Sequence, residues 1–263
     1  MSAKDITIKR IPTNIANEFV RRNHYSGKVV NNSQVHFGAF LNDKLHGVMS
    51  FGCPLDKRKV LGLVAGTGWN EMLELNRMAF DAVLPKNSES RSISIAMKLL
   101  RKNAPHIKWV LSFADGTRCG DGTIYRASGF ILTGFSEASM YALPDDLAKI
   151  NGGPIAHRLA LQCKTSTLSR EVLRRTGGKN LTNDGYEKLL GLKVIPGFML
   201  RYIYFLDPKQ RANLTVPELP FSEITRRGAG MYKGIKRVAS IDGDAAVFQT
   251  EKGGSIPTAT LQN

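Results

Sequence analysis

The stretch from Ile107 to Phe130, IKWVLSFADGTRCGDGTIYRASGF, decides the fold that we predict. It begins with the apolar run Trp109 to Ala114, whose length and β-branched and aromatic content are typical of a buried strand. The run ends at Asp115, and several glycines then mark a loop before a short helix that carries Tyr125. This order places the acid and the tyrosine at the same rim of a sheet, where α/β proteins hold their sites.

Apolar patterns predict further elements on both sides of this stretch. We expect strands at Asp5 to Ile11, Val35 to Leu41, Leu45 to Phe51 and Glu71 to Ala82, and helices at Asn14 to Asn23 and Ile93 to Lys102. After Phe130, two more strands, Ile131 to Thr133 and Ala138 to Leu143, are expected to finish the sheet.

The segment Glu71 to Ala82 is expected to be the central strand. Strict alternation places four side chains on one face, Leu73, Leu75, Arg77 and Ala79. An arginine in the middle of a strand is costly to bury without a partner. Arg77 is therefore expected to pair with an acid or to point into a ligand site.

Two polar segments are candidates for binding or catalysis. His24 and Tyr25 lie side by side where the first helix is expected to end, in a loop, and loops often carry functional groups. The second segment precedes the helix at Ile93 and contains Ser88, Ser90, Arg91 and Ser92. A polar loop between a strand and a helix N-terminus is the arrangement that receives a pyrophosphate.

The composition indicates a basic protein without membrane spans. The chain has 263 residues and a formal net charge of +15, from 37 Lys and Arg against 22 Asp and Glu. Its pI of about 9.9 is typical of a nucleic-acid binder, although basic proteins also bind anionic cofactors. The three cysteines indicate neither a disulfide framework nor a four-thiolate zinc site. No apolar run approaches the ~20 residues that span a bilayer, so we expect a cytoplasmic protein with no membrane partner.

The helix and its exit, Tyr125 to Phe130, resemble the last helix of the GCN5-related N-acetyltransferase family. In that family the tyrosine faces the sulfur of coenzyme A and can protonate the departing thiolate; the alternative is that Tyr125 is only a half-buried helix residue. The resemblance also implies that the coenzyme A pyrophosphate lies at Ser88 to Ser92. The family's glycine-rich signal is missing there, and serines replace the glycines.

A more specific resemblance comes from five segments in order: Asn23-His24-Tyr25, LELNRMAFD, Asn87 to Arg91, SFAD and YRASGF. Together they resemble the Mom family of phage Mu and its prophage relatives. The resemblance implies an α/β, acetyltransferase-like fold with a mixed, mostly antiparallel, twisted sheet flanked by helices and a basic C-terminal extension. We expect an acetyltransferase-like catalytic core at residues 1–149 and, at residues 150–263, an extension that packs on the core and contacts DNA.

The resemblance implies that the protein is a transferase that converts adenine in phage DNA to N6-carbamoylmethyladenine, with acetyl-CoA as cofactor, and so shields the DNA from host restriction enzymes. The host would be a bacterium and the gene would belong to a phage or prophage. The implied catalytic residues are His24, Tyr25, Arg77, Asp115 and Tyr125. The implied cofactor-binding residues are Ser88, Ser90, Arg91 and Ser92.

Elementary chemistry supports part of this assignment. The exocyclic amine of adenine is a weak nucleophile, so a base such as His24 and an orienting carboxylate such as Asp115 are reasonable. The amine is inaccessible within double-stranded DNA, so we expect a flipped adenine, with Tyr25 as a stacking surface. Ordinary acyl transfer joins nitrogen to a carbonyl carbon, whereas a carbamoylmethyl product joins it to the methylene carbon, and a further nitrogen must enter. A redox iron held by His24, Tyr25 and Asp115 is one hypothesis for activating that carbon.

Two other readings stay open at this point. The chain could be a conventional N-acetyltransferase that acts on a protein or a small amine, and mass analysis of nucleosides separates that reading from the first. It could also be a non-catalytic DNA-binding protein, in which case His24→Ala or Asp115→Ala would leave any phenotype intact. The sequence leaves the oligomeric state open, with a dimer among the possibilities.

Overall fold

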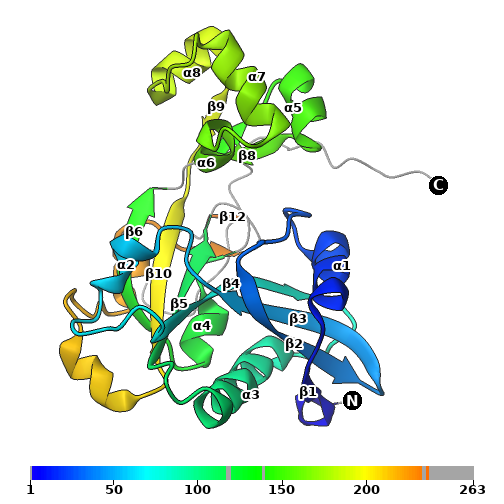
Figure 1. The fold of residues 1–263 in the computed structure, drawn as a ribbon, viewed down its shortest axis with the longest axis vertical. Helices are drawn as coiled ribbons and strands as arrows, with labels where there is room; N and C mark the ends of the chain where they lie inside the picture. The colour runs from blue at the N-terminus through cyan, green and yellow to red at the C-terminus, as the bar shows by residue number, and fades with distance from the viewer. Residues whose placement is uncertain (1, 117–119, 138–139, 233–234, 237–263) are drawn as a thin grey trace, which may run out of the picture.

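The centre of the molecule is a seven-stranded sheet in the order β1-β2-β3-β4-β5-β10-β6 (Figure 1). The computed structural model describes residues 2–116, 120–137, 140–232 and 235–236. The strands are β1 (Thr7–Arg10), β2 (Ser33–Leu41), β3 (Lys44–Gly52), β4 (Met72–Phe80), β5 (Trp109–Asp115), β6 (Ile131–Glu137) and β10 (Phe198–Phe205). All neighbours are antiparallel except β4 and β5, which are parallel. The predicted mixed, mostly antiparallel sheet flanked by helices is confirmed.

Helices cover the two faces of the sheet because successive strand residues point in opposite directions. On one face, α1 (Thr13–Asn23) packs against Val48 and Ala79. On the other, α3 (Ser88–Asn103) packs against Met49, and α4 (Thr123–Ala127) lies beside it. We call these the α1 face and the α3 face. A short helix, α2 (Lys57–Leu61), follows β3.

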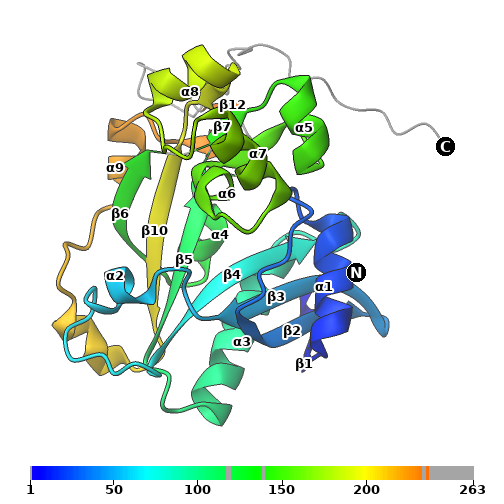
Figure 2. The same cartoon turned by 45° about the horizontal axis from the view of Figure 1, so that its top comes forward.

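A separate lobe is inserted between β6 and β10, which pair although about sixty residues separate them. We call residues 140–197 the inserted lobe. It contains a three-stranded sheet in the order β8-β7-β9 and four helices. Its elements are β7 (Met140–Ala142), α5 (Asp145–Asn151), β8 (Ile155–His157), α6 (Arg158–Gln162), α7 (Thr167–Arg175), α8 (Asn183–Leu190) and β9 (Lys193–Ile195). The lobe has its own apolar core and lies over one end of the main sheet (Figure 2).

One predicted strand pairs differently from the expectation. The segment expected at residues 138–143 does not finish the main sheet: β7 pairs with β8 and β9 in the inserted lobe, while residues 138–139 lie outside the described residues. β10 completes the main sheet instead. Alternation of apolar residues predicts a strand but not its partner, which explains the error. The division at residue 149 stays a prediction, and β10 lies beyond it.

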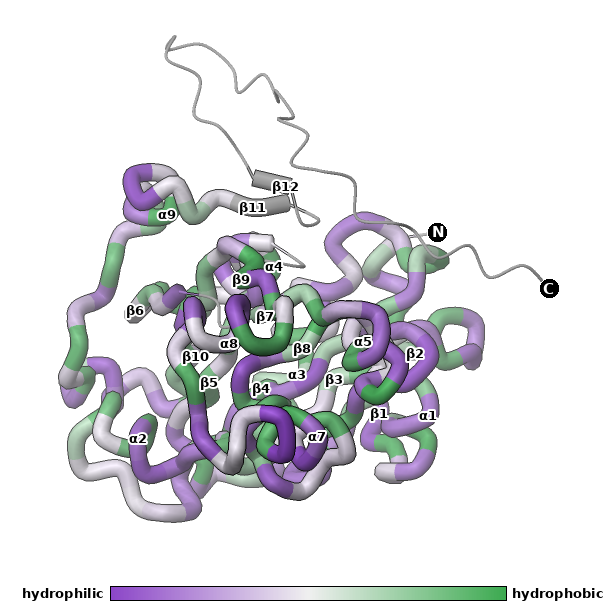
Figure 3. Tube along the Cα trace, turned by 90° about the horizontal axis from the view of Figure 1, so that it is seen from above, coloured by the Kyte–Doolittle hydropathy of each residue, from purple (hydrophilic) through white to green (hydrophobic). Residues whose placement is uncertain are grey.

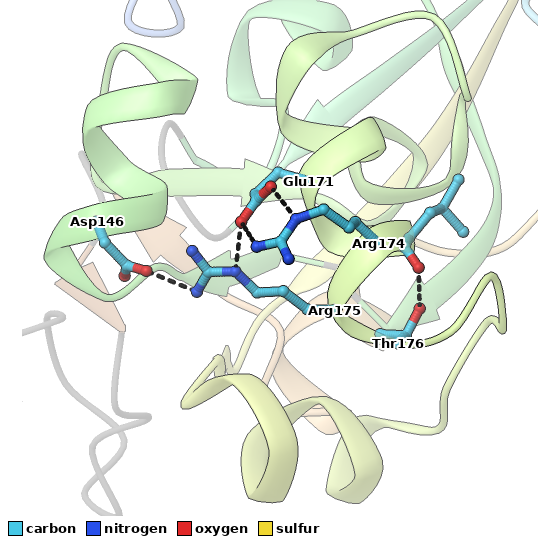
Figure 4. Close-up of polar contacts among 6 residues, drawn as sticks. Asp146, Glu171, Arg174, Arg175 and Thr176 are labelled. Carbon is cyan, nitrogen blue, oxygen red and sulfur yellow. Dashed lines mark hydrogen bonds and ion pairs between the residues drawn. The ribbon is translucent and has the colours of Figure 1, made fainter.

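An ion pair between Arg175 and Asp146 joins α7 to α5 in the lobe, and Glu171 on α7 holds the same arginine (Figure 4). The carboxylate of Glu171 accepts hydrogen bonds from Arg174 and Arg175, and Arg175 Nη1 lies 2.6 Å from Asp146 Oδ2. The hydrogen bonds from Arg174 and then Arg175 lower the pKa of Glu171 to about 2. Figure 3 shows hydrophilic and hydrophobic residues mixed along α5 and α7, as expected of helices with one buried face.

The chain continues after β10 with η2 (Pro208–Asn213), α9 (Ser222–Arg226), β11 (Met231–Tyr232) and β12 (Ile235–Lys236). The last part of the expected extension, residues 237–263, lies outside the described residues. Within the described ranges, no helix has both the length and the apolar character needed to cross a membrane.

Candidate active site

The parallel strands β4 and β5 pair only at their beginnings. Met72 to Glu74 align with Trp109 to Leu111, and no aligned pair follows in the described chain. One further link is the hydroxyl of Ser112, which donates to the carbonyl of Leu75 at 3.1 Å. The two strands diverge beyond this link. We call residues 75–80 and 112–115 the β4–β5 splay.

A β-bulge in β4 changes which side chains share a face. Leu75 aligns with Phe51 and Arg77 aligns with Ser50, so Asn76 is an extra residue on β4. The prediction that Leu73, Leu75, Arg77 and Ala79 share one face is therefore wrong. Before the bulge the leucines pack in the α3-face core, whereas after it Ala79 packs in the cluster under α1.

The bulge brings Glu74 and Arg77 to the α1 face together. Glu74 aligns with Leu111, which belongs to an apolar cluster on that face, and Arg77 alternates with Ala79. In a regular strand, residues three apart would point to opposite faces. Asp115 also points to the α1 face because it shares the alternation of Trp109 and Leu111.

The residues expected from the loop after α1 reach the end of β5. The hydroxyl of Tyr25 donates a hydrogen bond to Asp115 Oδ2 at 3.0 Å, across 90 positions of sequence. The ring of His24 lies 4.3 Å from the ring of Tyr25, centroid to centroid. Asp115 is 8% exposed and Tyr25 is 45% exposed, so the pair joins a buried acid to the surface.

His24 is oriented by the residue that follows Tyr25. Its Nδ1 accepts a hydrogen bond from the backbone N–H of Ser26 at 3.2 Å and lies 2.8 Å from the Ser26 hydroxyl. Burial, and then the positive charge of Arg77, lower the pKa of His24 to about 4. The ring is therefore neutral near pH 7, and because Nδ1 is an acceptor, the assigned tautomer has its proton on Nε2.

Arg77 is held by backbone carbonyls. Its Nε donates to the carbonyl of Lys28 at 2.9 Å, and its Nη1 donates to the carbonyl of Asn76 at 2.8 Å. Burial lowers its pKa, and the electrostatic influence of Tyr25 and Glu74 opposes that effect. The guanidinium thus fixes the loop that carries Tyr25 and adds a positive charge to the site.

Two residues near the site were not predicted from the sequence. Burial raises the pKa of Glu74 to about 7, against the influence of Arg77. His157 comes from the inserted lobe. Burial lowers the pKa of its imidazole, and the negative charge of Asp115 opposes that effect. The lobe is held to the loop after α1 by the Lys28 ammonium, which donates to Asn151 Oδ1 at 2.7 Å. The only sequence signal was an acid three residues before Arg77; nothing local signals His157.

Tyr125 lies in a different environment from Tyr25. It is 8% exposed and belongs to the core on the α3 face. Its ring centroid lies 5.3 Å from those of Phe130 and Tyr202. The predicted role of Tyr125 at the cofactor sulfur stays a prediction.

Comparison with known proteins identifies the family of the chain. The model of the Mom protein family matches residues 5–223. The chain belongs to the Mom protein family. The methylcarbamoylase Mom of Escherichia phage Mu is 39% identical over 142 residues, which cover 54% of this chain and 58% of the relative. The chain thus aligns with less than two thirds of that relative's length.

Two solved structures that align in part with this chain are acetyltransferases. One, from Bacillus subtilis in complex with CoA, has a TM-score of 0.39 and 9% identity and covers 76% of this chain and 97% of its own. Another, from Elizabethkingia anophelis with acetyl-CoA bound, has a TM-score of 0.40 and 11% identity and covers 76% and 98%. The fold assignment of this Mom-family chain rests on its own sheet order.

The expected cofactor residues of the Mom-family chain lie at the start of α3. The backbone N–H groups of Glu89 and Ser90 have no hydrogen-bond acceptor among the described residues. Asn87, in the left-handed conformation with φ 70°, precedes them as the N-cap. Free N–H groups at a helix N-terminus suit a phosphate, so the backbone here fits a pyrophosphate.

The side chains at the start of α3 differ in whether they are free to bind a cofactor. Ser88 is buried and its hydroxyl donates to the carbonyl of Pro85, while Ser92 is buried and its hydroxyl has no partner in the described chain. Ser90 is linked to α4 because its carbonyl accepts from the Ser128 hydroxyl at 3.3 Å. Arg91 donates to the carbonyl of Lys4 at 3.4 Å. As cofactor ligands, Ser88, Ser90, Arg91 and Ser92 stay predictions.

The donor atoms expected to hold iron do not fit a metal site as they are arranged. The assigned tautomer of His24 carries its proton on Nε2, and the Tyr25 hydroxyl is donated to Asp115. The described part of the chain also has no group of three or more His, Cys, Asp and Glu that could hold a metal ion. The iron hypothesis gains no support, and we derive no step through a metal.

Proposed function

We propose that this Mom-family protein is a transferase that converts adenine in phage DNA to N6-carbamoylmethyladenine, with acetyl-CoA as the co-substrate, and so protects the DNA from host restriction enzymes. The observation that carries the proposal is the hydrogen bond from Tyr25 to Asp115 at the β4–β5 splay. It joins two segments of the family's sequence pattern at one place on the α1 face. The name of the phage Mu relative, methylcarbamoylase, supports the chemistry.

The roles of the polar residues follow from their hydrogen bonds. The carboxylate of Asp115 accepts a proton from the exocyclic amine of adenine, and the Tyr25 hydroxyl holds the carboxylate in place. His24 is a weaker candidate for the base than expected, because its low pKa and its Nε2–H favour a hydrogen-bond donor. We assign His24 to donation toward a ring nitrogen of the base.

The substrate we propose is double-stranded DNA with the adenine flipped out of the stack. Base-modifying enzymes must extrude a base to reach its amine, and the half-exposed ring of Tyr25 offers a stacking surface. The net charge of +15 supplies attraction to phosphates regardless of sequence. Phage DNA in an infected cell lies in the bacterial cytoplasm, which is where we place the protein.

The proposed place for acetyl-CoA is the opposite, α3 face of the splay. The free N–H groups of Glu89 and Ser90 would receive the pyrophosphate. When bound, acetyl-CoA would supply the two carbons of the carbamoylmethyl group as a thioester. The amide nitrogen comes from a separate nitrogen donor that displaces the thiolate, and bonding of the adenine nitrogen to the methyl carbon releases two electrons and two protons to an external oxidant. Tyr125 holds a phenolic proton on the α3 face, where it can be given to a departing thiolate.

Mass spectrometry of nucleosides tests the proposal. The chain is expressed in bacteria, the DNA is digested, and deoxyadenosine is examined for the added mass of a carbamoylmethyl group. We expect the modified nucleoside in cells with the chain and none in cells with an empty vector. Unmodified deoxyadenosine together with an acetylated amine or protein would show a conventional N-acetyltransferase, and unmodified DNA alone would also contradict the proposal.

A further inference from the structure

A surface pocket of about 340 Å³ lies at the opposite end of α1 from His24. It is lined by Arg10, Ile11, Pro12, Thr13, Gln34 and His36. The pocket forms where β1 ends at Arg10 and the chain turns into α1, so that the start of β2 is left as a sheet edge. Its volume is in the range of small-ligand sites.

One residue that lines the pocket, His36, is a buried histidine with a ring nitrogen that no described residue hydrogen-bonds. His36 is 2% exposed, and its Nδ1 lies 2.8 Å from the hydroxyl of Ser50. Nε2 has no hydrogen-bond partner among the described residues. A buried polar atom without a partner is costly, so a ligand group that bonded to Nε2 would be favoured. In the tautomer in which the Ser50 hydroxyl donates to Nδ1, the neutral ring carries its proton on Nε2 and has a donor to offer a ligand.

The start of α1 adds backbone donors. The first helical hydrogen bond runs from the N–H of Ala16 to the carbonyl of Pro12, and Pro12 gives no side-chain cap. The N–H groups of Thr13, Asn14 and Ile15 have no acceptor in the described chain. The helix has eleven residues, and its dipole places partial positive charge at this end.

Arg10 completes the positive character of the pocket. Its guanidinium forms no ion pair with any described residue, and its charge, after burial, is a cause of the lowered pKa of His36. None of the lining residues is an acid, so the pocket offers no carboxylate to a cation.

We propose that this pocket binds a phosphate group. A guanidinium, a helix N-terminus and an imidazole N–H together match the charge and the several acceptor oxygens of a phosphate. The phosphate can belong to a nucleic-acid backbone or be free in solution, and both present the same oxygens. The site is separate from the Tyr25–Asp115 pair and does not rest on the proposed function.

Titration of the full-length protein with inorganic phosphate tests the site. The readouts are the heat of binding and the nuclear magnetic resonance signal of His36 Nε2. We expect saturable binding that shifts the His36 signal and that Arg10→Ala weakens at least tenfold. Lys9→Ala removes the neighbouring cation, which faces Asp43 and does not line the pocket, and should change the affinity less than twofold. Arg10 is exposed, so its truncation should leave the fold intact.

Absence of saturable binding, an unchanged His36 signal, or equal weakening by both variants would overturn the inference. A second titration, with a short DNA duplex, identifies the source of the phosphate. If the pocket takes a backbone phosphate, the duplex shifts the His36 signal and inorganic phosphate competes with it. If it takes free phosphate, the duplex leaves that signal unchanged; both results support the site. The result of the titration with inorganic phosphate does not depend on whether the protein modifies adenine.

Discussion

One hydrogen bond, from Tyr25 to Asp115, joins the loop after α1 to the end of β5. Asp115 ends a buried strand and Tyr25 lies in a loop, and the bond between them holds the loop over the β4–β5 splay. The sequence indicated both residues as polar groups at element ends. It could not indicate the bond, because that depends on the path of the loop after α1, which Arg77 fixes through the carbonyl of Lys28.

Tyr25→Phe tests this bond at the residue scale. The variant removes the hydroxyl and keeps the ring, so stacking should survive while the carboxylate of Asp115 loses the hydrogen bond from Tyr25. A hydrogen bond to a charged group is worth about 1.5–3 kcal/mol, so we expect a loss of roughly tenfold or more in the rate of adenine modification. Single-turnover assays on duplex DNA measure it. Tyr204→Phe, whose ring packs on Phe130, is the control and should keep the rate; a normal rate for Tyr25→Phe would contradict the assignment.

Glu74 should make stability depend on pH. Its pKa is raised from 4.5 to about 7, so the folded chain binds this proton more tightly than the unfolded chain. The stabilisation of the folded chain by protonated Glu74 is complete below pH 4.5, declines as the pH rises toward 7 and is lost above pH 7. The free energy of unfolding of the wild type should therefore fall by on the order of 2 kcal/mol between pH 5 and pH 8. The Glu74→Gln variant should not show this fall. Urea unfolding at both pH values measures the difference, and Glu187→Gln on the exposed side of α8 should behave as wild type.

At the scale of elements, the bulge in β4 and the loop before α4 decide where functional groups point. One extra residue, Asn76, places Glu74 and Arg77 on the same face. Gly122 begins α4 with φ +82°, and a Cβ there would overlap the ring of Tyr202. The Tyr202 hydroxyl donates to the carbonyl of Asp121, so the ring cannot easily move away.

Gly122→Ala should therefore be more harmful than the same change at another left-handed glycine. Gly191 ends α8 with φ +69°, and a Cβ there would meet no atom within 4 Å. Gly191→Ala should cost only the left-handed backbone, about 1–2 kcal/mol. Gly122→Ala should cost clearly more, because the clash adds to the same backbone penalty. Thermal or urea unfolding compares them, and equal losses would show that the approach to Tyr202 is unimportant.

The link from α7 to α5 should weaken when Glu171, which holds Arg175 on α7, loses its charge. Glu171 receives hydrogen bonds from two arginines, and its pKa of about 2 lies below the ordinary 4.5. Its contribution is thus present above pH 4.5 and lost as the pH falls toward 2. At pH 7, Glu171→Gln should speed amide hydrogen exchange in α5 and α7. Asp184→Asn, which removes an exposed ion pair with Lys188 on α8, is the control and should leave the exchange of those amides unchanged. Wild-type exchange rates in the Glu171→Gln variant would contradict the proposed role of Glu171.

For the whole molecule, local patterns predicted most elements but not their arrangement. Periodicity and apolar runs located the first five strands of the main sheet and helices α1 and α3, because these elements are buried on one face or on both. They misplaced β7, since the partner of a strand depends on contacts distant in sequence. The same reason hid His157, which reaches the neighbourhood of Asp115 only because a lobe is inserted between β6 and β10. The bulge at Asn76 was hidden because alternation in β4 gives no sign of an extra residue.

The central claim is that Asp115, held by Tyr25 at the splay, acts on the exocyclic amine of adenine. Nucleoside mass spectrometry of DNA from cells that express Asp115→Asn tests it most directly, with Asp56→Asn, an exposed acid at the start of α2, as the matched control. The account predicts carbamoylmethyl deoxyadenosine at the wild-type level in Asp56→Asn and a loss of at least a hundredfold in Asp115→Asn, with both variants folded by circular dichroism. Wild-type levels of the modified nucleoside in Asp115→Asn would contradict it.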